Sequence, residues 1–383
     1  MSRLVHSRHV EWLVRLIIFF VALYCFLGAI EMFGHAMNIM GAGAAASLFS
    51  GLSNPFAALA VGVFATVMMQ SSSATTSLVV TFVGAGTLTV ENAIPIIMGA
   101  NVGTSITNTL VAVGHVTQNA SFRRAFAGAT VHDIFNILTV IILLPLELTT
   151  GFLQRSAEFL QEWVDFFVNQ VLGGGGAFKS PIKASVEWMP EAYASALQNG
   201  LGLEGKWLAA VLIVTALAML IVALIAITKN MRLLMADKIE GWINRVLKKS
   251  GLLGLGIGAG ITALVQSSSI TTSLLIPMFG AGVLTLEAGF PIMLGANIGT
   301  TVTALLAATV AIGPAGLTIA LVHLLFNLTG TLIFFPFRTM RQIPIKLAEK
   351  LAELTVKNRV WVLVYILGTF VVAPLLGILI WRS

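Results

Sequence analysis

The chain is 383 residues long, and 57% of it is hydrophobic while only 10% is charged. A soluble domain carries roughly 25% charged residues, so this composition excludes a soluble protein. The formal net charge of +6 does not indicate nucleic-acid binding, because the basic residues lie in short segments between apolar runs. The residue alternation of a membrane barrel is absent, and we therefore predict an all-α polytopic membrane protein.

Seven apolar runs are each close to the ~20 residues that a helix needs to cross a bilayer. Two further apolar stretches, 54–87 and 252–283, are each long enough for two half-helices and carry Gln-Ser-Ser-Ser at the midpoint. We predict that both are re-entrant hairpins with a polar tip at mid-membrane depth, buried in protein or facing water. The predicted crossings are 13–33, 92–113, 125–146, 207–228, 288–311, 317–337 and 359–381.

The charges of the connecting segments orient these crossings, because Lys and Arg concentrate on the inner side of a membrane. The segments expected inside are 1–15, 114–124, 229–250 and 338–359, in each of which basic residues outnumber acidic ones. The segments expected outside are 34–54, which has no charged residue, and 147–206, which is acidic. These assignments alternate as seven crossings require, and they place the N-terminus inside.

Three crossings separate the hairpins, so the hairpins enter from opposite sides and the chain contains two inverted-topology repeats. The first repeat covers 1–146 and the second covers 207–337. Residues 147–206 are expected to form an external connector, partly flexible around a run of four glycines. Residues 338–383 comprise an inner-surface segment and the final span. Segment 229–250 mixes apolar with basic residues and predicts an amphipathic helix on the inner surface.

Two polar breaks recur in both repeats. The first break is Gln-Ser-Ser-Ser-x-Thr-Thr-Ser at 70–77 and 266–273, and the second is Gly-Ala-Asn-x-Gly-Thr at 99–104 and 295–300. Across both breaks the two copies share 21 of 35 residues without a gap. Packing of small residues between helices does not account for two matched copies. Doubled polar breaks are instead the sequence feature that points to a transporter's binding site.

Apart from Arg15 and Arg359 at the ends of two of them, the predicted spans contain no Lys or Arg. An anion bound within them must therefore be held by hydroxyls, amides and backbone N–H groups. Helix N-termini supply such donors, and we expect half-helices to begin at Thr75 and Thr271. The glycines of the second break predict discontinuous helices over 92–113 and 288–311, with new half-helices near Thr104 and Thr300. Hydroxyl, amide and carbonyl oxygens of the same segments suit a hard cation such as Na⁺.

A third repeated trace places a His and an Asn four residues apart, and therefore on one helix face. The residues are His132 and Asn136 in the first repeat, and His323 and Asn327 in the second. We interpret them as a polar clasp that supports the hairpins. Asp133 has no acidic counterpart in the second copy, and as an intramembrane acid it is a candidate coupling group.

At these motifs the sequence resembles the type II sodium-dependent phosphate cotransporters. The resemblance is carried by the two Gln-Ser-Ser-Ser copies, by 95–109 and by 122–133. It implies import of inorganic phosphate coupled to the inward sodium gradient by alternating access, with Na⁺ as the co-transported ion and both motifs in one site. The chain has no cysteine in the external connector and lacks long tails, so we expect a bacterial member of the inner membrane. In that membrane, residues 147–206 would be periplasmic. The sequence is also compatible with an oligomer.

The motif residues divide into two candidate sets on this interpretation. The candidates for phosphate are Ser71, Ser72, Ser267, Ser268, Asn101, Asn297, Thr104 and Thr300. The candidates for sodium are Gln70, Ser73, Thr75, Gln266, Ser269, Thr271, Asn101 and Asn297.

Three other functions are weighed against this one. An anion channel could use the same helix ends without sodium, and a sodium-coupled carrier could take another anion, such as a small carboxylate. A structural or signalling membrane protein would not need doubled polar breaks. Enzyme motifs are absent, with no phosphate-binding Gly-x-x-x-x-Gly-Lys loop, no His-Glu-x-x-His and no Cys/His metal cluster, so we do not expect an enzyme.

Overall fold

The computed structural model describes residues 2–41, 53–171, 181–246, 251–311 and 313–381, and within these ranges the protein is helical without a strand. Seven helical segments of the described chain are long and apolar enough to cross a membrane, which confirms the predicted crossings with small shifts at their ends. These segments are Val10–Met40 of α1, Val90–Val113 of α5 and α6, Asn119–Thr150 (α7), Gly205–Leu234 of α11, Leu286–Ala308 (α15), Ala315–Phe334 (α16) and Val360–Trp381 of α18 to α19.

Both Gln-Ser-Ser-Ser stretches form a helix, a break and a second helix. In the first copy α3 (Pro55–Met69) is followed by α4 (Ser72–Gly84), and in the second α12 (Gly251–Val265) is followed by α13 (Ser268–Ser273) and α14 (Leu275–Ala281). The break falls at a glutamine in each case, and these are the two non-glycine residues of the described chain with positive φ, 53° and 58°. The two units therefore turn in the same way at the glutamine, and they differ beyond it, where the second copy is interrupted again at Leu274.

The new helices begin three residues earlier than predicted, at Ser72 and Ser268 and not at Thr75 and Thr271. The reason is capping by the preceding serine. The Ser71 hydroxyl accepts a hydrogen bond from the backbone N–H of Ala74 at 3.2 Å, and Ser267 accepts one from Ile270 at 3.4 Å. A serine in this position satisfies a donor that the first helical turn leaves free.

The second polar break behaves differently in the two copies. In the first copy α5 (Val90–Gly103) ends and α6 (Ile106–Val113) begins after a two-residue interruption, as predicted. In the second copy α15 runs without interruption from Leu286 to Ala308, so the predicted broken helix over 288–311 is wrong.

The glycines of this motif serve close packing of helices and do not by themselves break a helix. A Cβ on Gly295 would lie 2.0 Å from the carbonyl oxygen of Leu255, and one on Gly99 would lie 2.1 Å from that of Leu59. No such contact is sterically allowed, so these positions exclude any side chain. They bring α15 against α12, and α5 against α3, backbone to backbone.

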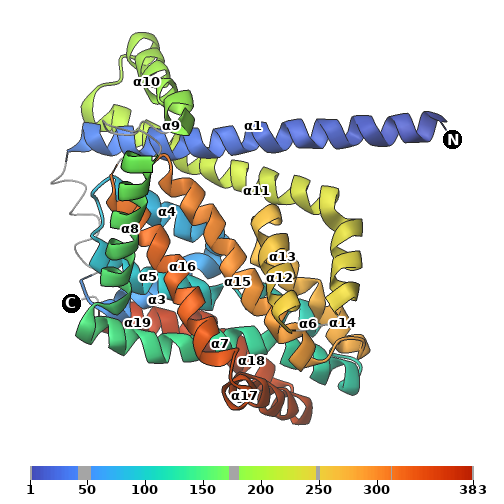
Figure 1. The fold of residues 1–383 in the computed structure, drawn as a ribbon. Coiled ribbons are helices and arrows are strands. Elements are labelled where there is room, and N and C mark those ends of the chain that lie inside the picture. Colours follow the sequence, from blue (N-terminus) through green and yellow to red (C-terminus); the bar gives the residue numbers. More distant parts are fainter. Residues whose placement is uncertain (1, 42–52, 172–180, 247–250, 312, 382–383) are drawn as a thin grey trace.

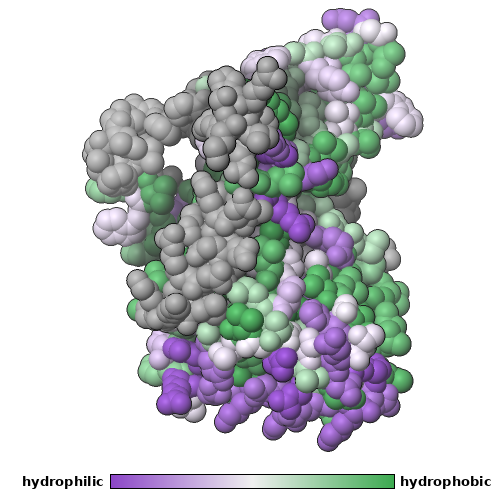
Figure 2. All heavy atoms as spheres, turned by 90° about the vertical axis from the view of Figure 1, so that its right-hand side faces the viewer, coloured by the Kyte–Doolittle hydropathy of each residue, from purple (hydrophilic) through white to green (hydrophobic). Residues whose placement is uncertain are grey.

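The helices are arranged around a buried layer that contains the motif segments. In Figure 1, α1 (Ser2–Met40) and α11 (Gly205–Val246) run side by side along the top, α7 runs along the bottom, and α4, α15 and α16 lie between them. Helix α17 (Arg338–Lys357) packs against α7, and α19 (Ala373–Trp381), which follows α18 (Val360–Leu367) and the π-turn Gly368–Val372, packs against α3. Turned by 90°, the molecule presents hydrophilic side chains mainly at its lower end (Figure 2).

The connector between the repeats contains α8 (Phe152–Val171), α9 (Pro181–Val186) and α10 (Trp188–Leu201). Helix α8 lies across the direction of α1 and α7 in Figure 1 and contacts α16, where the Thr318 hydroxyl donates a hydrogen bond to Gln161. The glycine run predicted to be flexible lies outside the described residues. The segment predicted as a separate helix over 229–250 is a direct continuation of α11 as far as Val246, and its last four residues also lie outside the described chain.

Candidate functional site

One cavity joins the tips of both motif copies. It has a volume of about 670 Å³ and is bordered by the break residues Gln70 and Ser71 of the first copy and Ser267 of the second. Ser73 also lines it. The rest of the wall comes from apolar side chains of α3, α4 and α13 and from one side of α11, including Leu224 and Thr228. Two segments 196 residues apart in the sequence thus face the same space.

The two tips are also in direct contact. The Ser73 hydroxyl donates a hydrogen bond to the backbone carbonyl oxygen of Gln266 at 3.2 Å, although the two residues belong to different repeats. A second link lies nearby, where the Thr272 hydroxyl donates to the side-chain oxygen of Asn108 at 3.0 Å. Serine and threonine hydroxyls, amides and carbonyl oxygens are the only polar groups at these contacts.

Equivalent hydrogen bonds fix the two glutamines. The Gln70 side-chain oxygen accepts from the Thr107 hydroxyl at 3.2 Å, and the Gln266 oxygen accepts from Thr303 at 2.7 Å. Each amide nitrogen donates back to a carbonyl of its own hairpin at 2.6 Å. Thr107 and Thr303 were not singled out in the sequence, although they occupy equivalent positions just beyond the aligned repeat.

The remaining hydroxyls of the motif are turned into the protein. Thr75 bonds to Thr66 at 3.0 Å, and Thr271 bonds to Thr262 at 2.8 Å, so each half-helix is tied to the helix before its break. The other motif serines, Ser72, Ser268 and Ser269, do not border the cavity; the first two are buried and the third is half-buried.

The asparagines of the second break lie behind the cavity, in a buried cluster that links the repeats. The Nε2 atom of His132 lies 2.6 Å from the Asn297 side-chain oxygen, and the Asn297 amide donates to Asn136 at 2.8 Å. Asn136 donates to the backbone carbonyl of Asn101 at 2.8 Å, and Asn327 donates to the Asn101 side chain at 3.2 Å. We call these five residues the Asn–His cluster; it connects α5, α7, α15 and α16.

Thr104 and Thr300 are buried and do not reach the cavity. Each hydroxyl donates to a carbonyl of its own helix four residues earlier, Ala100 and Ala296 respectively, at 2.9 Å. Both hydroxyls can still accept a hydrogen bond or offer an oxygen to a cation, because donation uses only the proton.

Asp133 and His323 are among the buried polar residues of the described chain that have side-chain atoms without a hydrogen-bond partner. Asp133 accepts from the Tyr365 hydroxyl at 2.6 Å and from Thr109 at 3.5 Å through Oδ2, while its Oδ1 has no partner. Neither ring nitrogen of His323 has a partner. Tyr365 comes from the last span, and no pattern in the sequence indicated that it would reach Asp133.

Sequence reasoning also missed the two basic residues of the cavity wall, Lys229 and Arg232. They were assigned to a separate amphipathic helix on the inner surface, because the apolar run ends at residue 228. Helix α11 continues past that point. The cavity wall therefore includes two basic residues that lie beyond the end of the predicted span.

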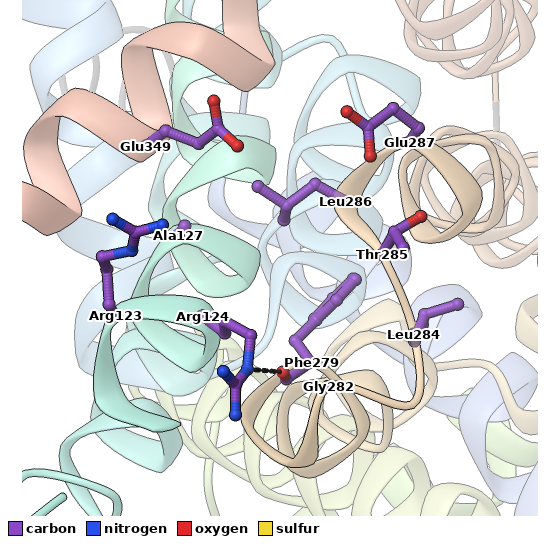
Figure 3. A pocket seen from close by; sticks show the side chains of 10 residues that line it. All are labelled: Arg123, Arg124, Ala127, Phe279, Gly282, Leu284, Thr285, Leu286, Glu287 and Glu349. Carbon is purple, nitrogen blue, oxygen red and sulfur yellow. Dashed lines mark hydrogen bonds between the residues drawn. The ribbon is translucent and has the colours of Figure 1, made fainter. Parts of the chain in front are cut away.

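A second cavity, of about 230 Å³, lies between α7, α14 and α17 (Figure 3). It carries charges of both signs, Arg123 and Arg124 with Glu287 and Glu349. The Arg124 guanidinium donates to the Gly280 carbonyl oxygen at 2.6 Å. No residue of a Gln-Ser-Ser-Ser motif lines this cavity, so its geometry does not make it the candidate site.

Comparison with known proteins identifies a family and several relatives. The family model described as Na+/Pi-cotransporter matches residues 25–153 and 219–351. Sodium-dependent phosphate transport protein 2B of Bos taurus is 34% identical across 94% of this chain, and protein 2A of Ovis aries is 35% identical across 92%. The 2B protein of Homo sapiens is 33% identical across 94%. The chain spans 64–65% of the length of these three relatives. No solved structure matches.

Proposed function

The chain belongs to the Na+/Pi-cotransporter family, and on this premise we propose that it is a secondary active transporter, not an enzyme, that imports inorganic phosphate with the inward sodium gradient. The observation that carries the proposal is the cavity that Ser71 and Ser267 line together. Two related binding elements, one from each repeat, border the same cavity, as in transporters that expose one site alternately to each side of the membrane. The matched relatives are named for sodium-dependent phosphate transport.

Phosphate would occupy the cavity between the two tips. An oxyanion there can accept hydrogen bonds from the hydroxyls of Ser71, Ser73 and Ser267, all of which line the space. The first turns of α4 and α13 begin at the same place, and their free backbone N–H groups add donors. The site holds no cation in its tips, so the negative charge of phosphate has to be compensated by something else.

Sodium is the group that supplies this charge. The polar groups at the tips are neutral hydroxyl, amide and carbonyl oxygens, which suit a hard cation such as Na⁺. The candidates nearest the cavity are Gln70 and the carbonyl of Gln266. Neutral ligands alone compensate poorly for the desolvation of a cation, and the negative charge of a phosphate bound nearby lowers the cost of burying the sodium ion. Each ion therefore strengthens binding of the other, and this is the source of coupling.

The buried groups behind the cavity would transmit or stabilise the bound state. In this proposal Asp133 is the coupling acid, because it is buried and has one oxygen without a partner in the described chain. The Asn–His cluster ties together helices of both repeats and can offer Asn101 and Asn297 oxygens to a second sodium ion. The other candidate residues would reach phosphate or sodium only if the helices move. They are Thr104, Thr300 and the serines that do not border the cavity, Ser72, Ser268 and Ser269.

The same proposal includes three further points. The two repeats are inverted relative to each other, both hairpins are re-entrant, and the protein lies in the inner membrane with its N-terminus in the cytoplasm. The loop charges support this orientation. On it, Lys229 and Arg232, which line the cavity and are exposed, would lie on the inner side. A cavity open beside them would release phosphate to the cytoplasm. A periplasmic 147–206 segment would then lie at the opposite end.

The test is uptake of labelled phosphate by the purified protein in liposomes. An inward sodium gradient should drive accumulation above the outside concentration, and potassium or choline in place of sodium should not. Equal, non-saturating uptake in all three salts would instead indicate an anion channel. Sodium-driven uptake of a small dicarboxylate with no phosphate uptake would indicate a carrier of another anion.

A further inference from the structure

The cavity that joins the two motif tips has two positive charges on one side of its rim. Lys229 and Arg232 stand three residues apart on α11 and therefore share a helix face, and both line the cavity. Both side chains are exposed. Within the described part of the chain neither forms an ion pair or a hydrogen bond, in contrast to Arg123 and Arg124 at the second cavity.

Among the side chains that the structure describes, no acidic one lines the same cavity. The other lining residues are apolar or carry neutral hydroxyl and amide groups. A cleft lined by one sign of charge with apolar walls concentrates the opposite ion and raises its rate of association, an effect that falls with ionic strength. The apolar walls here include Leu224 and Ile225, on the turn of α11 that precedes the two cations in the sequence.

The two cations also break the near-symmetry of the site. Their counterparts 196 residues earlier, at the spacing that relates the two motif copies, are Phe33 and Ala36 on α1, which are both buried. The polar tips are thus matched between the repeats, but the positive rim exists beside only one of the helices that precede them. Among the described residues that line this cavity, the positive charges are therefore confined to α11.

We propose that Lys229 and Arg232 form an anion-collecting rim that guides phosphate between the inner solution and the serines at the motif tips. This inference rests on the proposed phosphate transport. The rim would raise the affinity for phosphate on this side, while the tips supply selectivity and sodium supplies the charge of the bound state. The chemistry recognised is a phosphate oxyanion, which a free phosphate ion or the headgroup of an anionic lipid could provide, and the experiment separates the two.

The experiment is a calorimetric phosphate titration of the full chain in a detergent without anionic lipid, at fixed sodium and with increasing choline chloride. For the protein with both Lys229→Gln and Arg232→Gln we expect phosphate affinity about 3- to 10-fold weaker at low ionic strength, at the lower end of the effects that focused charge produces. The loss should vanish at high ionic strength. The charge-conserving pair Lys229→Arg and Arg232→Lys should retain wild-type affinity.

Lys206→Gln is the matched control, because Lys206 is an exposed cation at the other end of α11 and lines none of the described cavities. It should leave both the affinity and its salt dependence unchanged. Sodium-induced thermal stabilisation should persist in the neutralised protein, which verifies that the tips are intact.

Two results would overturn the proposal. One is a neutralised protein with wild-type phosphate affinity and salt dependence. The other is loss of bound phosphatidylglycerol from the neutralised protein, with phosphate affinity unchanged, since the rim would then be a lipid contact. Absence of phosphate binding by the wild-type protein would count against the proposed function itself, and is distinct from both.

Discussion

Ser71 and Ser267 have two functions that one substitution can separate. Each hydroxyl caps a helix through a backbone N–H, and each lines the cavity. Alanine would remove both functions, whereas glycine keeps a good N-cap and removes only the hydroxyl, at a cost of a few tenths of a kcal/mol to the helix.

We therefore expect Ser71→Gly and Ser267→Gly each to weaken phosphate binding by about 1–3 kcal/mol, because a buried hydrogen-bond partner is lost. The melting temperature should stay close to that of the wild type. The double variant should be non-additive, because both hydroxyls contact one ligand. Strict additivity in calorimetric titrations of the cycle would argue for two independent sites.

Asn297 is expected to matter for stability before it matters for binding. Its side chain bonds to His132 and to Asn136, both fully buried. Asn297→Ala would leave two buried groups without a partner, at a cost of roughly 1–3 kcal/mol for each. Asn230→Ala is a suitable comparison, since that half-buried amide only bonds to a carbonyl of its own helix.

Thermal unfolding in detergent, with and without sodium, distinguishes the two functions of Asn297. A lower melting temperature with sodium stabilisation intact assigns it to the Asn–His cluster alone. Loss of sodium stabilisation in addition assigns it to a sodium site. A melting temperature no lower than that of Asn230→Ala would contradict the hydrogen bonds described for it.

Much of the site could be predicted from the sequence because it is repeated. The motif serines, the two glutamines and the His and Asn pairs were identified as matched copies, and the structure brings both tips to one cavity. Tyr365 and Asn108 could not be found in this way, because each meets its partner through packing between distant helices. Thr107 and Thr303 could have been found by extending the repeat a few residues.

At the scale of helices, glycine contacts decide how closely the helix pairs of the two repeats approach. We expect Gly99→Ala and Gly295→Ala each to reduce folded yield and melting temperature, because the added methyl would overlap a carbonyl oxygen at 2.1 and 2.0 Å. Overpacking of this kind costs about 1–3 kcal/mol, and more where backbone is in the way.

Gly256→Ala and Gly260→Ala are matched controls on α12. Both glycines are exposed, and a Cβ there meets nothing within 4 Å. Alanine should leave stability unchanged or raise it by roughly 0.5–1 kcal/mol, from its better helix propensity in water. If all four substitutions lowered the melting temperature equally, glycine flexibility and not close packing would be the property required.

The C-terminal end of α14 is held by an arginine whose neighbour offers a control. Arg124 donates to carbonyl oxygens at the end of α14 (Figure 3). Arg123 instead pairs with Glu353 at 3.3 Å through side chains that are 58% and 53% exposed. Arg124→Gln should lower stability by roughly 0.5–1.5 kcal/mol, the value of a typical net hydrogen bond. Arg123→Gln should have little effect, since exposed ion pairs contribute about 0–1 kcal/mol. Equal melting temperatures for the two variants would contradict a special function of Arg124.

Helix type was easier to predict than helix continuity. Length and hydropathy sufficed for the seven crossings, because the bilayer sets both. The Gly-Ala-Asn motif was taken as a break in both copies, yet only the first copy is interrupted, since the same glycines are used for packing in each. The continuation of α11 past residue 228 was missed because the charged residues there were assigned to a separate amphipathic helix on the inner surface.

At the scale of the whole molecule, the proposed site is built from two repeats and takes two ions. Neither motif tip contains an acidic or basic residue, so each ion lacks a counter-charge unless the other is bound. Phosphate and sodium should therefore raise each other's affinity by the same factor, as thermodynamic linkage requires. The proposed positive rim on α11 would raise the affinity for phosphate, but it is not part of the coupling between phosphate and sodium.

The measurement that tests this most directly is a calorimetric phosphate titration of the solubilised protein in sodium and in choline buffers of equal ionic strength. A coupling of about 1–3 kcal/mol predicts phosphate binding roughly 5- to 150-fold tighter in sodium. The reverse titration, of sodium with and without phosphate, should give the same factor. Equal phosphate affinities in the two buffers would contradict a shared site at the motif tips.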